Sequence, residues 1–398
     1  MRVSTANRYD AAVQLLQLRQ ADMTTSQTQM TSGKRINRPS DDPVGAASAE
    51  RAYIAQQRIA SNQRSVDASR NAMTLAESAL GQADDMLQGV RETLVAAGNG
   101  SLGASGRATL AAQLGQFRAE LLALANQTDS TGAYLFGGQG ATAIPFLDTP
   151  AGVQVAGTGG QNQLSASEQM PTTVDGQAIW LAAPSGNGVF VSAAVVGNQG
   201  KAWIDAGTVT DPAAVTLSTY QISFSGSGPG ATYSVTQDGV ATAQSDGVYG
   251  AGTAITVDGM TVHISGAPAD GDSFTLLPSA HDLSVFAALD RAIATLKNPS
   301  ANAGQVAQSV NNGLRDVDAV MAHLQAARAE AGSTLIRLDA LDGRNQDRQL
   351  QAKAVQSDAE DVDMVQAISE FKNQQVGYQA ALQSYASVQR MSLFDYLK

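Results

Sequence analysis

The chain has 398 residues, which is enough for two or three domains, and only 5% of them are aromatic, which favours thin, elongated packing over one wide core. It contains no cysteine, so a disulfide framework and a thiolate metal site are both excluded. The formal net charge is −11, and residues 139–282 account for −10 of it, with eleven carboxylates and one base, Lys201. This acidic segment repels phosphate groups, so we expect no nucleic-acid partner.

Two further signals are missing from the sequence. Residues 1–7 carry no apolar core of a cleavable secretory signal peptide. No run approaches the ~18 apolar residues of a membrane-spanning helix, so we expect no span and no membrane partner.

The first predicted helix begins near the N-terminus. Its seam positions recur in steps of three and four, as on one face of an amphipathic helix. The seam consists of Ala6, Tyr9, Val13, Leu16, Gln20, Met23, Gln27 and Met30. A break follows at Ser32-Gly33, and Pro39 and Pro43 prevent a smooth continuation of the helix.

The next predicted helix runs from about Val44 to Ala97 and carries the strongest periodicity in the chain. Its seven-residue series is Ile59, Val66, Met73, Leu80, Leu87 and Leu94, and its partner series is Asn62, Ser69, Ala76, Ala83, Val90 and Ala97. A third helix follows on the four-three steps of Leu110, Leu114, Phe117, Leu121 and Leu124.

The period of the pattern changes between about Gly137 and Pro278, where glycine is frequent and apolar residues alternate. The alternating runs are Tyr220-Ile222-Phe224, Tyr233-Val235, Ile255-Val257 and Val262-Ile264. Asp238-Gly239 and Asp258-Gly259 are hairpin-turn signals between such runs. These features predict an acidic, β-rich domain inserted between helical flanks.

Helical periodicity returns in the last flank. One helix carries Phe286, Leu289, Ile293 and Leu296 and ends at Asn298-Pro299, and the next carries Val306, Val310, Leu314, Val317, Met321 and Leu324. The final seam consists of Leu350, Ala354, Ser357, Asp361, Met364, Ile368, Phe371, Gln375, Tyr378, Leu382, Tyr385 and Gln389. Asp361 lies on this apolar seam, so we expect it to have a basic partner or to face solvent.

Together these elements predict an α+β fold, with a long helical bundle or coiled coil built from both termini and an inserted β-rich outer domain. We predict three parts: residues 1–43 with 350–398 as terminal coiled-coil segments, 44–138 with 281–349 as a helical bundle, and 139–280 as the β domain. About five apolar contacts contribute roughly 10 kcal/mol to the first seam, whereas ordering its ~30 residues costs ~1–2 kcal/mol each. We therefore expect the terminal helices to order on assembly, by pairing with each other, with neighbouring subunits, or with both.

The segment Ser32 to Ala47, SGKRINRPSDDPVGAA, resembles the loop between the first two helices of the bacterial flagellin family. Ser40 or Asp41 is a suitable N-cap and Pro43 suits a first helical turn. Capping does not account for Arg35, Ile36 and Asn37 just upstream. The resemblance implies that this loop contacts an adjacent subunit. The predicted contact residues are Arg35, Ile36, Asn37, Asp41 and Asp42.

Both ends of the chain carry the resemblance further. Ser357 to Asp363 resembles the acidic stretch that opens the last flagellin helix, and an acidic first helical turn explains these charges about equally well. Residues 1–9 and 391–397 resemble the ends of hook-associated members of the family rather than of filament flagellin. The terminal residues that we expect in assembly contacts are Val13, Leu16, Met23, Met364, Ile368, Phe371, Leu382, Tyr385, Leu393 and Phe394.

The resemblance implies a structural subunit, an adaptor at the hook–filament junction. Its implied partners are further copies of itself in a ring, another hook-associated junction protein, filament flagellin or the filament cap, and a cytoplasmic export chaperone on the C-terminal helix. It also implies export by the flagellar type III apparatus to the flagellum outside the cell. The alternatives are filament flagellin itself, or a secreted adhesive or carbohydrate-binding protein that uses the β insert.

Catalytic chemistry has little support in the sequence. His263, His281 and His323 are far apart, and no His-Glu-x-x-His motif occurs. The glycines at 137–140 do not open a phosphate-binding helix, and Asp270-Gly271-Asp272 predicts a turn rather than a calcium site. We therefore expect no enzyme, no cofactor and no metal site.

Overall fold

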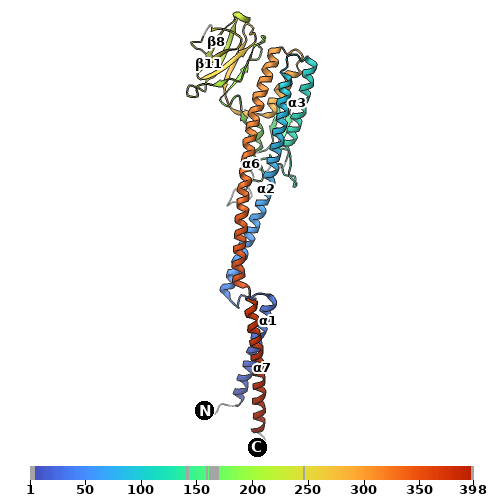
Figure 1. Cartoon of the computed structure of the whole chain (residues 1–398), viewed down its shortest axis with the longest axis vertical. Helices are drawn as coiled ribbons and strands as arrows, with labels where there is room; N and C mark the ends of the chain where they lie inside the picture. The colour runs from blue at the N-terminus through green and yellow to red at the C-terminus, as the bar shows by residue number, and fades with distance from the viewer. Residues whose placement is uncertain (1–4, 140–142, 158–159, 161–169, 245–246, 396–398) are drawn as a thin grey trace. The chain divides into compact units, whose positions relative to one another are not determined.

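The computed structural model describes residues 5–139, 143–157, 160, 170–244 and 247–395. Along the chain helices come first, strands follow, and helices return (Figure 1), which confirms the predicted α+β fold with a β-rich insertion. Contacts divide the chain into two compact units, residues 1–64 with 341–398, and residues 65–340. Among the described helices, none has the length and apolar character of a membrane span.

The described α-helices follow the predicted order. They are α1 (Thr5–Ser32), α2 (Pro43–Ala97), α3 (Ala104–Ala125), α4 (Gly176–Leu181), α5 (Val285–Lys297), α6 (Ala303–Glu360) and α7 (Met364–Asp395). The final seam from Leu350 to Gln389 is divided between two helices, because α6 ends at Glu360 and α7 begins at Met364.

The heptad series of α2 forms the helical core of the second unit. Its residues from Val66 to Leu94 are at most 2% exposed, as the periodicity predicts. Helix α6 contributes a buried series of its own at the same spacing, Val310, Val317, Leu324, Ala331 and Leu338. Ion pairs join the two helices in antiparallel order: Arg70 to Asp339, Glu77 to Arg328, and Arg91 to Asp318.

Helices α3 and α5 pack beside this pair. A Cβ at Gly89 of α2 would lie 2.8 Å from the Phe117 ring of α3, so a larger residue at 89 would push the two helices apart. At the start of α5, the Ser284 hydroxyl caps the helix by accepting the Ala287 N–H. The rings of Phe136 and Trp180 meet edge to face at 5.4 Å, and both side chains are buried.

The strands of residues 146–283 are antiparallel throughout. They are β1 (Phe146–Thr149), β2 (Gly152–Val155), β3 (Ala183–Pro184), β4 (Phe190–Ala194), β5 (Trp203–Ile204), β6 (Thr208–Val209), β7 (Tyr220–Ser225), β8 (Thr232–Gln237), β9 (Val240–Ala241), β10 (Gly247–Val248), β11 (Thr253–Val257), β12 (Met260–Ser265), β13 (Ser273–Pro278) and β14 (His281–Leu283). One sheet has the order β10-β8-β7-β13-β4 with β9 on β8, and a second has β11-β12-β5 with β6 on β12. The pairs β1-β2 and β3-β14 are separate.

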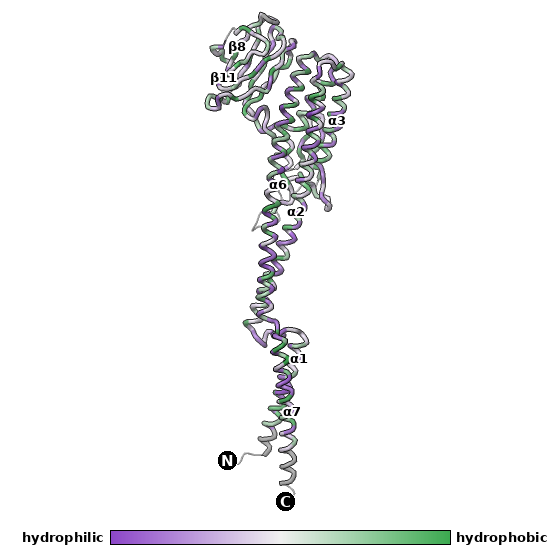
Figure 2. The backbone as a smooth tube through the Cα atoms, viewed as in Figure 1, coloured by the Kyte–Doolittle hydropathy of each residue, from purple (hydrophilic) through white to green (hydrophobic). Residues whose placement is uncertain are grey.

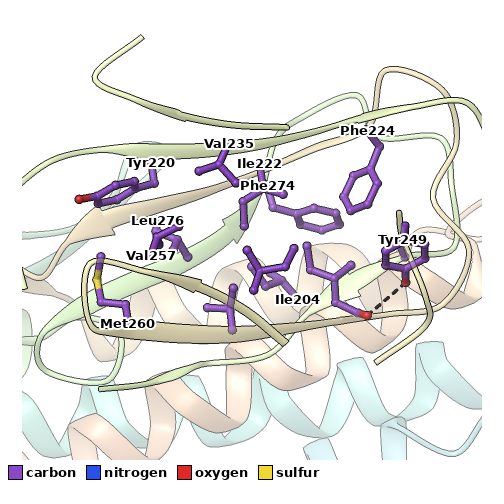
Figure 3. Packing of buried hydrophobic residues seen from close by; sticks show 14 of the residues in the cluster. Ile204, Tyr220, Ile222, Phe224, Val235, Tyr249, Val257, Met260, Phe274 and Leu276 are labelled. Carbon is purple, nitrogen blue, oxygen red and sulfur yellow. Dashed lines mark hydrogen bonds between the residues drawn. The ribbon is translucent and has the colours of Figure 1, made fainter. Parts of the chain in front are cut away.

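Both predicted hairpin turns are confirmed. Asp238 and Asp258 adopt φ values of 49° and 39°, and each is followed by a glycine that also has positive φ. The alternating apolar residues of the adjoining strands form one buried cluster (Figure 3). Phe224 and Phe274 meet edge to face inside it at 6.0 Å. The Tyr220 hydroxyl contacts the Asp258 carboxylate, and burial together with this carboxylate raises the pKa of Tyr220.

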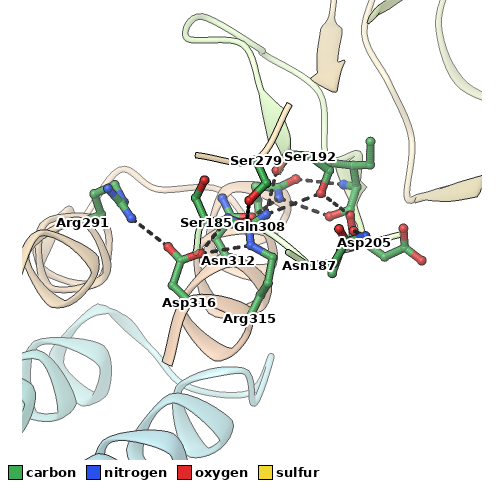
Figure 4. A network of polar contacts seen from close by, with 12 residues as sticks. Ser185, Asn187, Ser192, Asp205, Ser279, Arg291, Gln308, Asn312, Arg315 and Asp316 are labelled. Atoms are coloured by element: carbon green, nitrogen blue, oxygen red, sulfur yellow. Dashed lines mark hydrogen bonds and ion pairs between the residues drawn. The ribbon is translucent and has the colours of Figure 1, made fainter. Parts of the chain in front are cut away.

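A buried polar network joins these strands to α6 (Figure 4). The Gln308 amide pairs with the backbone of β5, accepting from Ile204 N at 2.8 Å and donating to Ile204 O at 3.2 Å. Arg315 donates to Ser192 O at 2.8 Å and to the buried carboxylate of Asp316, which Arg291 also contacts at 2.7 Å. Because each buried charge has partners, the network fixes the β strands on the helix without an unpaired ion.

The first strands of the predicted β segment pack on helices. The Asn126 amide at the end of α3 pairs with both backbone groups of Phe146, each at 3.0 Å. Arg118 of α3 donates to both oxygens of Asp148 at 2.7 and 2.8 Å and also to Asp290 of α5. Its hydrogen bond lowers the pKa of Asp148.

Candidate assembly interface

The terminal helices α1 and α7 lie side by side (Figure 1), which is one of the pairings that the sequence leaves open. Hydrophobic and hydrophilic residues are interspersed along the coloured parts of both helices (Figure 2), and among the described side chains of the pair only Ser26 and Ala367 are buried. Ser26 is buried at this contact and donates to Gln374 at 2.9 Å. A Cβ at Gly377 would lie 2.7 Å from the Arg19 guanidinium, so the glycine leaves room for that side chain.

The structure separates the predicted seam residues into two groups. Leu16, Met23, Phe371 and Tyr385 are half-buried. Val13, Met364, Ile368 and Leu382 are 38–44% exposed, because Ala367 and Ser26 occupy buried positions of the contact instead. Leu393 and Phe394 belong to the α7 backbone, but their side chains are not among those that the structure describes.

Large apolar side chains remain on the outer surface of both helices. Leu18 is 62% exposed, Val365 82% and Val376 66%. Two packed helices bury only one face each, so the remaining apolar surface is left without cover. This surface offers contacts for an additional helix.

The loop between α1 and α2 is attached to the corner between α6 and α7. Backbone groups form this attachment: Arg35 N donates to Glu360 O at 2.6 Å, and Val362 N donates to Gly33 O at 3.0 Å. Gly33 has φ of 73°, which lets the chain turn directly after α1. The Lys34 ammonium adds an ion pair with Glu360 at 2.9 Å.

Within the loop, the predicted contact residues make bonds to their own chain. Arg35 donates to Ala359 O at 2.7 Å and reaches Asp42 at 3.3 Å, while Asn37 donates to Lys34 O at 3.1 Å. Ile36 is buried, and a Cβ at Gly45 would lie 2.5 Å from its Cδ1. The role of Arg35, Ile36 and Asn37 toward an adjacent subunit stays a prediction.

The two aspartates of the loop, Asp41 and Asp42, accept hydrogen bonds from different backbone groups. Asp42 caps α2 by accepting Val44 N at 3.1 Å and Gly45 N at 2.9 Å, so the prediction of Ser40 or Asp41 as the cap is wrong. Asp41 instead accepts the Asn37 and Arg38 N–H groups and closes the preceding turn. The Gly45 N–H, and then the charge of Arg35, lower the pKa of Asp42.

The α6–α7 corner is acidic. Asp361 is exposed and contacts the Ser357 hydroxyl, so the predicted solvent-facing position is confirmed and it needs no buried basic partner. Asp363 caps α7 by accepting Val365 N at 2.9 Å and Gln366 N at 3.2 Å. The sequence places the start of the last helix in Ser357–Asp363, but Ser357 to Glu360 form the last turn of α6, so the expected acidic first turn is wrong there and only Asp363 opens α7.

The histidines and the Asp-Gly-Asp motif singled out in the sequence have local contacts in the structure. Within them, no group of three or more histidine, aspartate or glutamate side chains could hold a metal ion. His263 pairs with Asp205 at 3.0 Å, a contact that sequence spacing did not reveal. Asp272 accepts backbone N–H groups from Gln199 and Ala269, so the Asp-Gly-Asp motif closes loops.

A family model described as the bacterial flagellin N-terminal helical region matches residues 3–141, and the bacterial flagellin C-terminal helical region matches residues 314–397. Residues 195–278 match the D2-like domain of flagellar hook-associated protein 1, a likeness of the β insert that the sequence patterns did not indicate.

Similar proteins extend the likeness to the whole chain. Flagellar hook-associated protein 3 of Escherichia coli K12 is 28% identical over 409 residues, covering 100% of both chains. The solved FlgL structure from Xanthomonas campestris in space group C2 has a TM-score of 0.68 at 28% identity and covers 78% of this chain and 99% of that one. The flagellar junction protein FlgL of Legionella pneumophila has a TM-score of 0.66 at 27% identity, covering 72% of this chain and 99% of that one.

Proposed function

This chain belongs to the bacterial flagellin family, and from that premise we propose that it is a structural subunit of the flagellum, an adaptor at the hook–filament junction. The observation that carries the proposal is its end-to-end similarity to hook-associated protein 3, rather than to filament flagellin. The apolar surface left open on α1 and α7 supports assembly through these helices.

The proposed mechanism is packing of terminal helices between subunits. The α1–α7 pair leaves Leu18, Val365 and Val376 exposed, and burial of such side chains against neighbouring helices is favourable. Contacts between different surfaces of identical chains do not close on themselves in pairs, so they build rings or open helical arrays. Residues 1–43 with 350–398 would form the inner layer, 44–138 with 281–349 the next, and 139–280 the outer domain.

The proposed partners follow from a place between two polymers. Below the ring we propose another hook-associated junction protein, and above it filament flagellin or the filament cap. Arg35, Ile36, Asn37, Asp41 and Asp42 would shape the surface of the loop that an adjacent subunit contacts. Because Arg35 bonds to the α6–α7 corner and Asp42 caps α2, substitutions there would affect folding and assembly together.

Export through the flagellar type III apparatus, to the outside of the cell, completes the proposal. A chain without cysteine travels without forming disulfide bonds. Before export, the exposed apolar residues of α7 need cover, and a cytoplasmic chaperone on this C-terminal helix would supply it.

A strain that lacks this chain tests the proposal. We expect hooks without filaments, and flagellin monomers released into the medium, with recovery on complementation by the wild-type chain. Hooks that carry normal filaments in this strain would overturn the adaptor role. Adhesion by the β insert would then be the function to test.

A further inference from the structure

The first unit contains a hollow with a mixed apolar and basic lining. It has a volume of about 520 Å³ and lies between α2 and α6. Ala52, Ala55 and Ala352 form its small apolar surfaces, and Val355, 52% exposed, lies at the same hollow. Arg51 from α2 and Arg348 from α6 supply its charges. We call these six residues the basic groove.

The two arginines of the basic groove have no acidic partner among the described residues. Arg51 donates to Ala47 O at 3.2 Å and to the Ser48 hydroxyl at 3.1 Å, both on its own helix. Within the described chain, Arg348 forms no ion pair with a carboxylate. Two guanidinium groups beside an apolar surface favour a partner that is both acidic and apolar.

The same chain carries such a surface elsewhere in this unit. Residues 356–370 contain five carboxylates and neither lysine nor arginine, a charge of −5. Asp358 and Asp361 are exposed there, and Val365 follows on the adjoining turn of α7. We call Asp358, Asp361 and Val365 the acidic corner. Its charge and its apolar side chain complement those of the basic groove.

One copy does not join these two surfaces by itself. Arg348 and Asp358 lie ten residues apart on the continuous helix α6, about 15 Å at ~1.5 Å per residue. A rigid helix holds them at that separation, so within one molecule Asp358 does not reach Arg348, and the two surfaces stay free to meet those of another copy. The two surfaces differ, and their contact is therefore head-to-tail and propagates from copy to copy.

We propose that the basic groove of one subunit binds the acidic corner of a second copy of this chain. The inference rests on the proposed self-assembly and names the surfaces that mediate it. Burial of Val365 beside the groove alanines supplies the apolar contact. The charge pairs set the register, and salt weakens them.

Disulfide trapping tests the contact directly, because the native chain has no cysteine. Arg348→Cys and Asp358→Cys are combined in one chain that complements the deletion strain, and isolated flagella are treated with a mild oxidant. We expect a ladder of cross-linked multiples of this chain, whereas each single variant stays monomeric. Lys353→Cys with Asp358→Cys is the matched control, since Lys353 is exposed on α6 but does not line the groove.

A charge exchange covers the case in which the cysteine variants fail to assemble. Arg51→Glu with Arg348→Glu should lower the fraction of cells with filaments about tenfold, and adding Asp358→Lys with Asp361→Lys should restore it to within about twofold of wild type. Cross-linking no stronger than in the control, together with no rescue, overturns the contact. So does a cross-link to a chain of different mass.

The two proposals fail in different ways. If the deletion strain grows normal filaments, the junction function itself is wrong. If filaments are lost on deletion but neither the ladder nor the rescue is found, the junction function stands and only this contact is wrong.

Discussion

The exposed apolar residues of α1 and α7 allow assembly to be separated from folding. Leu18, Val365 and Val376 are 62%, 82% and 66% exposed in the isolated chain. We predict that replacing all three by glutamine, a good helix former, changes the free energy of unfolding of the soluble protein by less than about 1 kcal/mol, because little buried surface is lost.

The effect on assembly should be much larger. Full burial of a leucine or valine contributes about 1.5–3 kcal/mol, and the exposed fractions leave about 1–2 kcal/mol per side chain for a neighbouring subunit to provide. The three together amount to about 4 kcal/mol. Since 1.4 kcal/mol is about tenfold in an equilibrium constant, association should weaken by roughly a thousandfold.

Two measurements check this prediction. Urea unfolding followed by circular dichroism reports the stability of the purified chain, and counts of cells with filaments report assembly in the complemented deletion strain. Exposed Gln17→Ala with Gln379→Ala is the control and should leave both unchanged. Normal filament numbers in the triple glutamine variant would refute the reasoning, as would a loss of several kcal/mol in monomer stability.

Three further predictions concern the second unit. Leu87→Ala, at a fully buried seam position, should destabilise this unit by about 3–5 kcal/mol in urea unfolding, and an unchanged midpoint would contradict the packing. Gln308→Leu should leave both backbone groups of Ile204 unpaired, at about 1–3 kcal/mol each, and speed amide exchange at Ile204. Arg118 lowers the pKa of Asp148 below its ordinary value of 3.8. The ion pair therefore stabilises the folded chain above pH 3.8, and this contribution is lost as the pH falls through the lowered pKa. Asp148→Asn should therefore flatten the acid limb of a stability–pH curve, and an unaltered limb would exclude the pair as its source.

Much of the fold was predictable because its signals are local. The seven-residue spacing of α2 requires one buried face, and the structure buries that face from Val66 to Leu94. Asp258-Gly259 favours a turn with positive φ whatever surrounds it, and β11 and β12 pair across it. The acidic loops of the insert likewise follow from composition alone.

Other features depend on competition between local signals. Four-three spacing continues through Asp361, yet the chain leaves the helix there, because the Asp363 cap and the backbone bonds from the 33–36 loop replace the helical bonds that are lost. The cap of α2 is Asp42 rather than Ser40 or Asp41, because the Val44 and Gly45 N–H groups meet its carboxylate while Asp41 closes the preceding turn.

By itself the sequence determined the type and order of the elements, since side-chain periodicity and turn chemistry act over a few residues. It also carried the likeness to flagellin in the 32–47 loop and at both ends. Only the tertiary structure decided that Arg118 meets Asp148, that Gln308 pairs with β5, and that Leu18 and Val365 are left uncovered. These outcomes depend on how distant segments approach one another, and a repeating pattern states that a face will be buried but not which segment will bury it.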